Sequence, residues 1–183
     1  MKANAGEIPI RDSTDGDMAA VRSIYAHHVQ NGLASFEEVA PDPAEMARRR
    51  HAVLKGGFPF RVAELRGTVK GYAHAGPYRH RPAYRFSVEN SVYVAPDALG
   101  LGLGRLLLAD LIERCTALGH RQMIAIIGDS GNAASINLHA NLGFREIGVV
   151  KSAGFKFGRW VDSVIMQRPL GDGDDSPPGD WRR

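Results

Sequence analysis

Runs of β-branched and aromatic residues alternate along the chain with stretches in which apolar residues recur every three or four positions. The runs predict strands at 8–11, 60–65, 69–75, 86–94, 122–128, 144–150 and 161–167. The three-and-four spacing predicts helices at 18–31, 44–55, 103–118 and 133–141. Strands interleaved with helices in this order indicate an α/β (α+β) domain with a mixed, mostly antiparallel sheet.

The most informative stretch joins the strand that ends before Pro96 to the helix that follows it. Three glycines at alternate positions, Gly100, Gly102 and Gly104, separate the two elements. Missing side chains allow a ligand to approach the backbone closely, and the first turn of a helix presents unpaired N–H groups and a partial positive charge. We therefore expect an anion such as a pyrophosphate to bind at this turn.

Two common phosphate-binding motifs are excluded by spacing. A dinucleotide fingerprint would need a glycine at 105 or 107, where the chain has Arg105 and Leu107. A nucleotide-hydrolase loop would need Gly-Lys-Ser or Gly-Lys-Thr, and the turn instead ends Gly104-Arg105-Leu106. A turn that only lets the helix pack tightly on the strand remains a possible reading of the glycines alone.

Length and composition predict one domain with short flexible ends. The chain has 183 residues, enough to bury a substantial core. We assign the domain to residues 8–170, with a flexible N-terminus at 1–7 and a tail at 171–183 whose Asp, Pro and Gly content predicts disorder.

Charge and hydropathy narrow the function. The N-terminus lacks an apolar signal core and no apolar run is long enough to span a bilayer, so we expect a cytoplasmic protein with no membrane partner. The formal charge of +3 is dispersed apart from the run Arg48–Arg50, which does not favour nucleic acid as a partner. The alternation of basic and aromatic residues at Tyr78–Arg85 leaves an RNA-binding patch as an alternative for that stretch. The single cysteine, Cys115, lies on an apolar helix face and is expected to be a buried thiol.

Glu89 is the first candidate for catalysis. It lies two residues before the apolar run that starts at Ser91, and a carboxylate within an apolar strand is costly unless it is partnered or functional. Partial desolvation would raise its pKa towards the range of a general base. A solvent-facing glutamate on a half-buried strand is the structural alternative.

The order of the motifs resembles the GCN5-related N-acetyltransferase (GNAT) superfamily, and within it the phosphinothricin and methionine sulfoximine/sulfone acetyltransferases. The lead-in Val92-Tyr93-Val94 with Pro96 resembles the family's V-x-V-x-P, although Leu99 replaces the usual Gln or Arg of the following turn. The other matching segments are Ala34–Glu37, Ala75–Tyr78, Ala83-Tyr84, Val88–Ser91, Asn132–His139, Leu142–Phe144 and Gly154–Trp160.

The resemblance implies a GNAT fold with about seven strands and four helices, and acetyl-CoA as co-substrate without a metal. The implied catalytic residues are Glu89, as base, and His139, as assisting acid or base, with their division of proton transfer left open. The resemblance assigns coenzyme binding to Val92, Tyr93, Val94, Gly100, Leu101, Gly102, Leu103, Gly104, Arg105, Asn132 and Ser135.

The implied acceptor is a small amino acid analogue such as phosphinothricin, methionine sulfoximine or methionine sulfone, acetylated on its α-amine for detoxification. The resemblance places Phe36 in the loop over this acceptor, Arg81 and Tyr84 on its carboxylate, and Lys156 and Trp160 at its far side in a homodimer. Arg79 and Arg85 remain alternatives to Arg81. Other functions left open are acetylation of a protein N-terminus or a polyamine, and acyl-CoA sensing without turnover.

Overall fold

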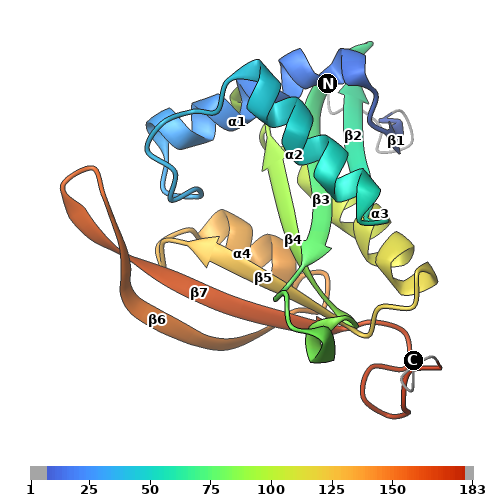
Figure 1. The fold of residues 1–183 in the computed structure, drawn as a ribbon. Coiled ribbons are helices and arrows are strands. Elements are labelled where there is room, and N and C mark those ends of the chain that lie inside the picture. The colour runs from blue at the N-terminus through green and yellow to red at the C-terminus, as the bar shows by residue number, and fades with distance from the viewer. Residues whose placement is uncertain (1–7, 180–183) are drawn as a thin grey trace.

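A single seven-stranded sheet organises the protein (Figure 1). The structure, a computed structural model, describes residues 8–179, so the predicted N-terminal segment 1–7 and the last four residues of the predicted tail lie outside it. The strand order is β1-β2-β3-β4-β5-β7-β6, and of these neighbours only β4 and β5 are parallel. The strands are β1 Ile10–Asp12, β2 Phe60–Leu65, β3 Thr68–Pro77, β4 Ser87–Val94, β5 Gln122–Gly128, β6 Arg145–Lys156 and β7 Arg159–Pro169.

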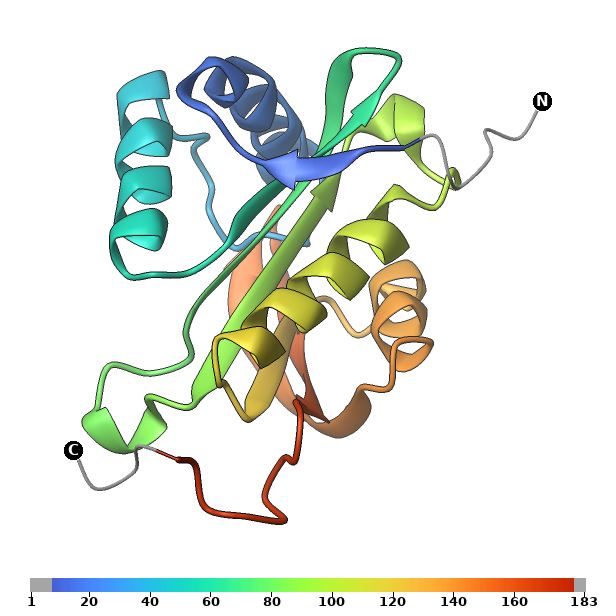
Figure 2. The same cartoon turned by 90° about the vertical axis from the view of Figure 1, so that its right-hand side faces the viewer.

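Two pairs of helices cover the two faces of the sheet (Figures 1 and 2). The helices are α1 Met18–Asn31, α2 Pro43–Lys55, α3 Leu103–Ala117 and α4 Ala133–Ala140. On one face, the Tyr25 ring of α1 packs edge-on against the Tyr93 ring of β4, with 5.1 Å between the ring centroids. On the other, α3 buries Leu107, Leu108 and Leu111 against the strands. The predicted mixed, mostly antiparallel α/β domain is confirmed.

The pairing of β4 with β5 stops halfway along the strands. Their register runs from Ser87 opposite Gln122 to Asn90 opposite Ala125 and goes no further. β4 nevertheless continues to Val94 and β5 to Gly128. Figure 1 shows the two strands diverging beyond this point. The sheet is therefore split at its centre, with β3 still paired to one side of the split and β7 to the other.

The last two strands are longer than the sequence pattern predicts. The predicted connection at 151–160 is instead a continuation of both strands, which meet in a two-residue turn at Phe157 and Gly158. Both turn residues have positive φ, 52° and 73°, as a type I′ hairpin requires. A register shift between Val150 and Gly154, where Ser152 also has positive φ, lets the long hairpin bend. The irregularity hides the period-two pattern on which the prediction relied.

A buried cation fixes α3 to the sheet. The Arg61 side chain of β2 is 3% exposed and donates from Nε to Asp110 Oδ2 of α3 at 2.8 Å. It also pairs with Asp12 and donates to the Ile10 carbonyl at 3.2 Å. Removing one partner of a buried charge is strongly destabilising, so this cluster holds the helix that follows the glycine turn in a defined place.

The described part of the predicted tail contains neither helix nor strand. Residues 171–179 form turns, and Arg121 donates to Ser176 Oγ at 2.9 Å while pairing with Asp172. Flexibility of the tail stays a prediction. Between residues 8 and 179, no helix combines the length and apolarity needed to cross a bilayer.

Candidate active site

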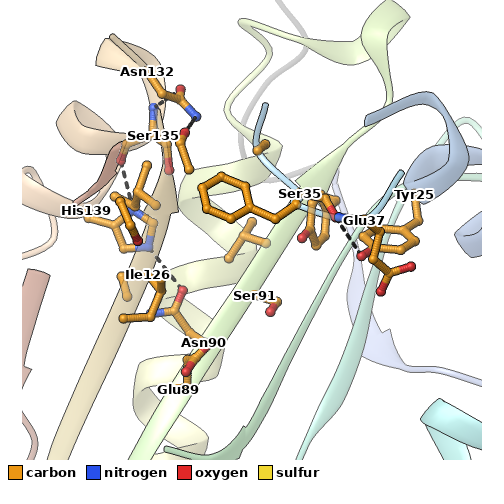
Figure 3. A pocket seen from close by; sticks show the side chains of 18 residues that line it. Tyr25, Ser35, Glu37, Glu89, Asn90, Ser91, Ile126, Asn132, Ser135 and His139 are labelled. Atoms are coloured by element: carbon orange, nitrogen blue, oxygen red, sulfur yellow. Dashed lines mark hydrogen bonds between the residues drawn. The ribbon is translucent and has the colours of Figure 1, made fainter. Parts of the chain in front are cut away.

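A cavity of about 520 Å³ lies where β4 and β5 separate (Figure 3). It is bounded by the diverging halves of the two strands, by α4, and by the loop that follows α1. The lining residues are Tyr25, Ala34, Ser35, Phe36, Glu37, Glu89, Asn90, Ser91, Val92, Tyr93, Ala125, Ile126, Ile127, Gly128, Asn132, Ser135, His139 and Ser163.

Alternation along β4 decides which backbone groups face the split. Ala95 N–H donates to the Lys70 carbonyl at 2.8 Å, and Tyr78 N–H donates to the Ser87 carbonyl at 3.3 Å. Because paired residues alternate in an antiparallel ladder, the odd-numbered residues of β4 turn their backbone groups towards β3. The N–H groups of Val92 and Val94 therefore face the space that β5 leaves, whereas that of Tyr93 faces β3.

The carbonyl of Val94 is occupied by a histidine. His28 Nε2 lies 2.9 Å from the Val94 oxygen and, because a carbonyl oxygen only accepts, the histidine is the donor. Burial lowers the pKa of His28, which the bond to Val94 opposes. The neutral ring can make this bond, so the end of β4 is held without a charge.

The glycine turn has the backbone geometry that the sequence predicts. Gly100 and Gly102 have φ of 75° and 88°, and a Cβ on either would meet no atom within 4 Å. Leu106 N–H is bonded to the Gly102 carbonyl at 3.1 Å, so the amides of the first turn of α3, from Leu103 to Arg105, have no partner within the helix. These amides are available to an anion.

Gly104 has a packing reason as well. A Cβ there would come within 3.3 Å of Leu138 of α4, tighter than most contacts between such atoms. The alternative considered for the sequence motif, close packing of the helix, therefore applies to this third glycine. The first two serve the turn, and Leu101 and Arg105 are exposed beside them.

Glu89 and His139 approach the cavity from opposite faces of the sheet. Side chains alternate along a strand, so Glu89 lies on the same face as Tyr93, towards α1, and Asn90 lies on the face of α4. Burial raises the pKa of the Glu89 carboxyl above its ordinary value, and the nearby Arg79 guanidinium opposes this rise. The carboxylate predicted in an apolar strand is thus partly desolvated, a change in the direction that favours a general base.

His139 is 4% exposed and is held on three sides. Its Nδ1 lies 2.8 Å from the Ser135 carbonyl, its Nε2 lies 3.1 Å from Asn90 Oδ1, and the Phe144 ring meets it edge-on at 5.0 Å. Figure 3 shows both hydrogen bonds. Burial lowers the pKa of His139, and the bond to Ser135 opposes this.

The predicted cap of α4 is confirmed. Asn132 Oδ1 accepts from Ser135 N–H at 3.2 Å, and Asn132 Nδ2 donates to the Gly128 carbonyl at 3.4 Å. Asn132 and Ser135 both line the cavity, so their predicted role in coenzyme binding is compatible with their position. The cap joins the end of β5 to the helix that carries His139.

The loop after α1 forms a lid over the split. A Cβ at Gly128 would collide with the Leu33 carbonyl, and one at Gly154 would lie 2.7 Å from the Phe36 ring. The loop therefore rests on two positions that have no side chain. Tyr25 and Ser35 share a hydrogen bond of 2.9 Å between their hydroxyls, which ties the loop to α1.

Lys156 secures this loop from the hairpin side. Its side chain donates from Nζ to the Gly32 carbonyl at 2.9 Å and to the Ser35 carbonyl at 2.7 Å. The residue is 3% exposed, and burial lowers the pKa of its ammonium group. It does not line the cavity, and neither does Trp160, which is 66% exposed. In this chain Lys156 thus holds the lid, and its predicted place at the far side of an acceptor stays a prediction.

The basic loop lies outside the cavity wall. Arg81 and Tyr84 are exposed and are not among its lining residues. The Arg79 guanidinium lies over the Tyr78 ring at 5.2 Å and acts electrostatically on Glu89. Arg85 lies over the Phe86 ring at 4.6 Å. Arg79, one of the three arginines left open by the sequence, therefore carries a charge that opposes the rise in the pKa of Glu89.

Several lining residues were not predicted. Asn90, Ser91, Tyr25 and Glu37 belong to the cavity, although sequence reasoning assigned them no role. For Asn90 a signal was present, because a second polar residue next to Glu89 in an apolar strand also has to find a partner. Across residues 8–179 there is no group of three or more histidine, cysteine, aspartate or glutamate side chains placed to hold a metal.

Comparisons with known proteins agree on one family. Residues 10–165 match the family described as Acetyltransferase (GNAT) domain. A phosphinothricin N-acetyltransferase of Alcaligenes faecalis is 57% identical over 169 residues, which cover 92% of this chain and 86% of that protein. An L-methionine sulfoximine/L-methionine sulfone acetyltransferase of Pseudomonas aeruginosa is 43% identical over 162 residues, covering 88% and 94%.

A solved structure is similar over nearly the whole chain. The crystal structure of a phosphinothricin acetyltransferase from Sinorhizobium meliloti in complex with AcCoA superposes with a TM-score of 0.92. It is 47% identical and covers 95% of this chain and 94% of its own.

The role of Lys156 can be tested through the lid. In Lys156→Met the two charge-assisted bonds to the loop are lost, and we expect the Glu37 amide, which donates to Ser35 Oγ, to exchange with deuterium about tenfold faster or more. Lys151→Met is the matched control, because Lys151 lies on the same strand in an exposed ion pair and should change exchange by less than about twofold. Equal exchange in the two variants would refute the role of Lys156 as the loop's anchor.

Proposed function

Because the chain belongs to the GNAT acetyltransferase family, we propose that it transfers the acetyl group of acetyl-CoA to the α-amine of a small amino acid analogue. The acceptor class is that of phosphinothricin, methionine sulfoximine and methionine sulfone, and the reaction serves detoxification in the cytoplasm. The observation that carries the proposal is the split between β4 and β5, with Glu89 on one face of it and His139 on the other.

The residues at the split fit acetyl-CoA. The thioester supplies an activated acyl group. Amides at the start of α3, from Leu103 to Arg105, suit its diphosphate, since Gly100 and Gly102 leave open space in front of them. The N–H groups of Val92 and Val94 face the vacated edge of β4, where they can bond the pantetheine arm and polarise the thioester oxygen.

The two faces suggest a division of proton transfer. Acetyl transfer needs a base for the amine and an acid for the departing sulfur. Glu89 lies on the face of α1 and the lid, where Ser35, Glu37 and Ser91 provide polar groups for an amino acid. His139 lies on the face of α4, beside the glycine turn of α3. We therefore assign the base to Glu89 and the acid to His139.

The basic loop supports recognition of a carboxylate. Arginine pairs with carboxylates through two parallel hydrogen bonds. Arg79 is close enough to Glu89 to affect its pKa, so it can also act on an acceptor held beside Glu89. Arg81 and Tyr84 lie on the same exposed loop and complete the proposed carboxylate subsite when the acceptor binds.

We also propose a homodimer, formed by the β6–β7 hairpin. Exposed apolar side chains gather there: Ile147, Val150, Phe155, Phe157 and Trp160. The ring centroids of Trp160 and Phe155 lie 5.3 Å apart, so these two side chains form one continuous surface. An exposed apolar surface of this kind marks an interaction site. A second copy is the occupant that this proposal names, with Trp160 near the partner's lid.

Turnover by Glu89→Gln tests the base. We expect kcat to fall about 100-fold or more, because the amine keeps its proton, while the Kd for acetyl-CoA stays within about twofold. The assay is thiol release with phosphinothricin, methionine sulfoximine, methionine sulfone, spermidine and a short peptide as acceptors. Glu113→Gln, an exposed glutamate on α3, is the control.

The same panel separates the alternatives. Thiol release only with spermidine or the peptide would move the acceptor to another class. Absence of release with every acceptor, with acetyl-CoA still bound, would reduce the protein to an acyl-CoA sensor. Wild-type turnover in Glu89→Gln would remove Glu89 as the base.

The pH profile distinguishes Arg79 from Arg81. Removing the cation in Arg79→Gln disfavours ionised Glu89, so its pKa rises and the low-pH limb of kcat/KM moves to higher pH. Arg81→Gln should raise the KM for the acceptor about tenfold without moving this limb. If the low-pH limb of kcat/KM does not move in Arg79→Gln, Arg79 has no effect on the pKa of Glu89.

Sedimentation tests the dimer. We expect wild type at micromolar concentration to sediment with the mass of two chains and Trp160→Glu with the mass of one, since a charge would be buried at the interface. Val39→Glu, at an exposed apolar residue in the loop between α1 and α2, should leave the mass unchanged. A wild type with the mass of one chain would exclude the homodimer.

A further inference from the structure

Asn90 lies at the point where the sheet divides. It is the last residue of β4 in register with β5, and it is 6% exposed. Its Nδ2 donates to the Ile124 carbonyl of β5 at 3.2 Å, and its Oδ1 lies 3.1 Å from His139 Nε2 of α4. One side chain therefore connects both strands at the fork to the helix behind them.

The Ile124 carbonyl fixes the orientation of the Asn90 amide. A carbonyl oxygen can only accept, so the group facing it must be the Nδ2 donor. Turning the amide over would place Oδ1 against the Ile124 oxygen, an acceptor against an acceptor. With Nδ2 on Ile124, the atom that faces His139 is Oδ1, which also can only accept.

His139 is consequently enclosed by two acceptors. Its Nδ1 faces the Ser135 carbonyl and its Nε2 faces Asn90 Oδ1. A neutral imidazole has one N–H and can satisfy one of these oxygens, whereas the imidazolium satisfies both. In the neutral ring with its proton on Nδ1, the Nε2 lone pair points at the Asn90 oxygen, which is unfavourable.

We propose that Asn90 is a positioning residue for acetyl transfer: by accepting from Nε2 it holds the second proton on His139, so that the ring is an acid at the moment the sulfur departs. The inference rests on the proposed function. As the C–N bond forms and the C–S bond breaks, the amine gives one proton to Glu89 and the sulfur takes the Nε2 proton. Proton transfer from Glu89 through solvent to Nε2 then restores both residues.

Two effects oppose one another at His139. Burial lowers the pKa of His139, and the bond to Ser135 opposes this. An acceptor at Nε2 acts in the same direction as Ser135, because it also favours the charged ring. The titratable side chains that share the cavity are Glu37, Glu89, Tyr25 and Tyr93, all presented from the face of α1 and the lid. The cavity residues from β5 and β7 are uncharged, and so is the Phe144 ring just before β6: Ala125, Ile126, Ile127, Ser163 and Phe144.

Two substitutions at position 90 form a matched pair. Asn90→Leu and Asn90→Asp are similar in size, and both remove the Nδ2 donor to Ile124, so destabilisation from that loss is common to them. They differ in what faces Nε2. Leucine offers no acceptor, and the pKa of His139 should fall by about one unit. Aspartate offers a carboxylate, and the pKa of His139 should then rise by about one unit or more.

The measurement is ¹⁵N NMR of the imidazole groups across pH, with His139 assigned by its absence from His139→Gln. We expect both ring nitrogens of His139 to carry protons in the wild type over a pH range below its pKa, and opposite displacements of its titration in the two variants. Because an acid acts only while it is protonated, the high-pH limb of the kcat profile should follow the pKa of His139. It should move to lower pH in Asn90→Leu and to higher pH in Asn90→Asp.

Displacements in the same direction, or none, would overturn the proposal, as would a wild-type Nε2 without a proton at every pH at which the protein is folded. The spectra need no substrate. If no acceptor is acetylated but the His139 titration moves as expected, the proposed function fails while the effect of Asn90 on the ring stands.

Discussion

The parallel pairing of β4 and β5 ends at Asn90, and the rest of the structure depends on that interruption. Backbone N–H and C=O groups inside a protein need partners. Two strands that separate in the middle of a sheet are stable only if something else satisfies their inner edges. Here His28 bonds the Val94 carbonyl, Asn132 bonds the Gly128 carbonyl, and Asn90 bonds Ile124 at the fork itself. The amides that remain facing the gap, those of Val92 and Val94, are the groups that we propose bind the coenzyme.

The elements around the gap are held by different kinds of interaction. α3 is anchored from beneath by the buried Arg61 cluster, and α4 by the Asn132 cap. The lid depends on a lysine that reaches it from a strand more than a hundred residues away, and on two glycines that leave room for it. The cavity is thus built mainly on helices and strands. Its one side that is a loop is held by Lys156, which donates to the carbonyls of Gly32 and Ser35.

Sequence reasoning succeeded where the signal is local. The apolar patterns of β4, α3 and β5 are strong, and the glycines at 100 and 102 adopt the positive φ that their spacing indicates. Glu89 stood out because a carboxylate is unusual in such a strand. Asn132 was recognised as a cap from its position before a helix. The resemblance to a family pointed to His139, which lines the cavity, and its role in proton transfer stays a prediction.

The remainder depends on contacts between distant parts of the chain. Neither Lys156 nor the carbonyls of Gly32 and Ser35 has a local pattern that reveals their bond. The bend near Ser152 concealed the length of the last hairpin, and the link from Asn90 to His139 spans two elements that are 49 residues apart. Propensity and spacing describe single elements, whereas these features arise from how the elements are placed against one another.

The split has one more consequence, for the order of events in a catalytic cycle. Glu89 and His139 reach the gap from opposite faces of the sheet, so under the proposed function acetyl-CoA and the acceptor would approach it from different sides. In that case neither ligand would have to leave before the other arrives, and both could be present together. Such an arrangement permits direct passage of the acyl group within a ternary complex, without any side chain of the protein becoming acylated on the way.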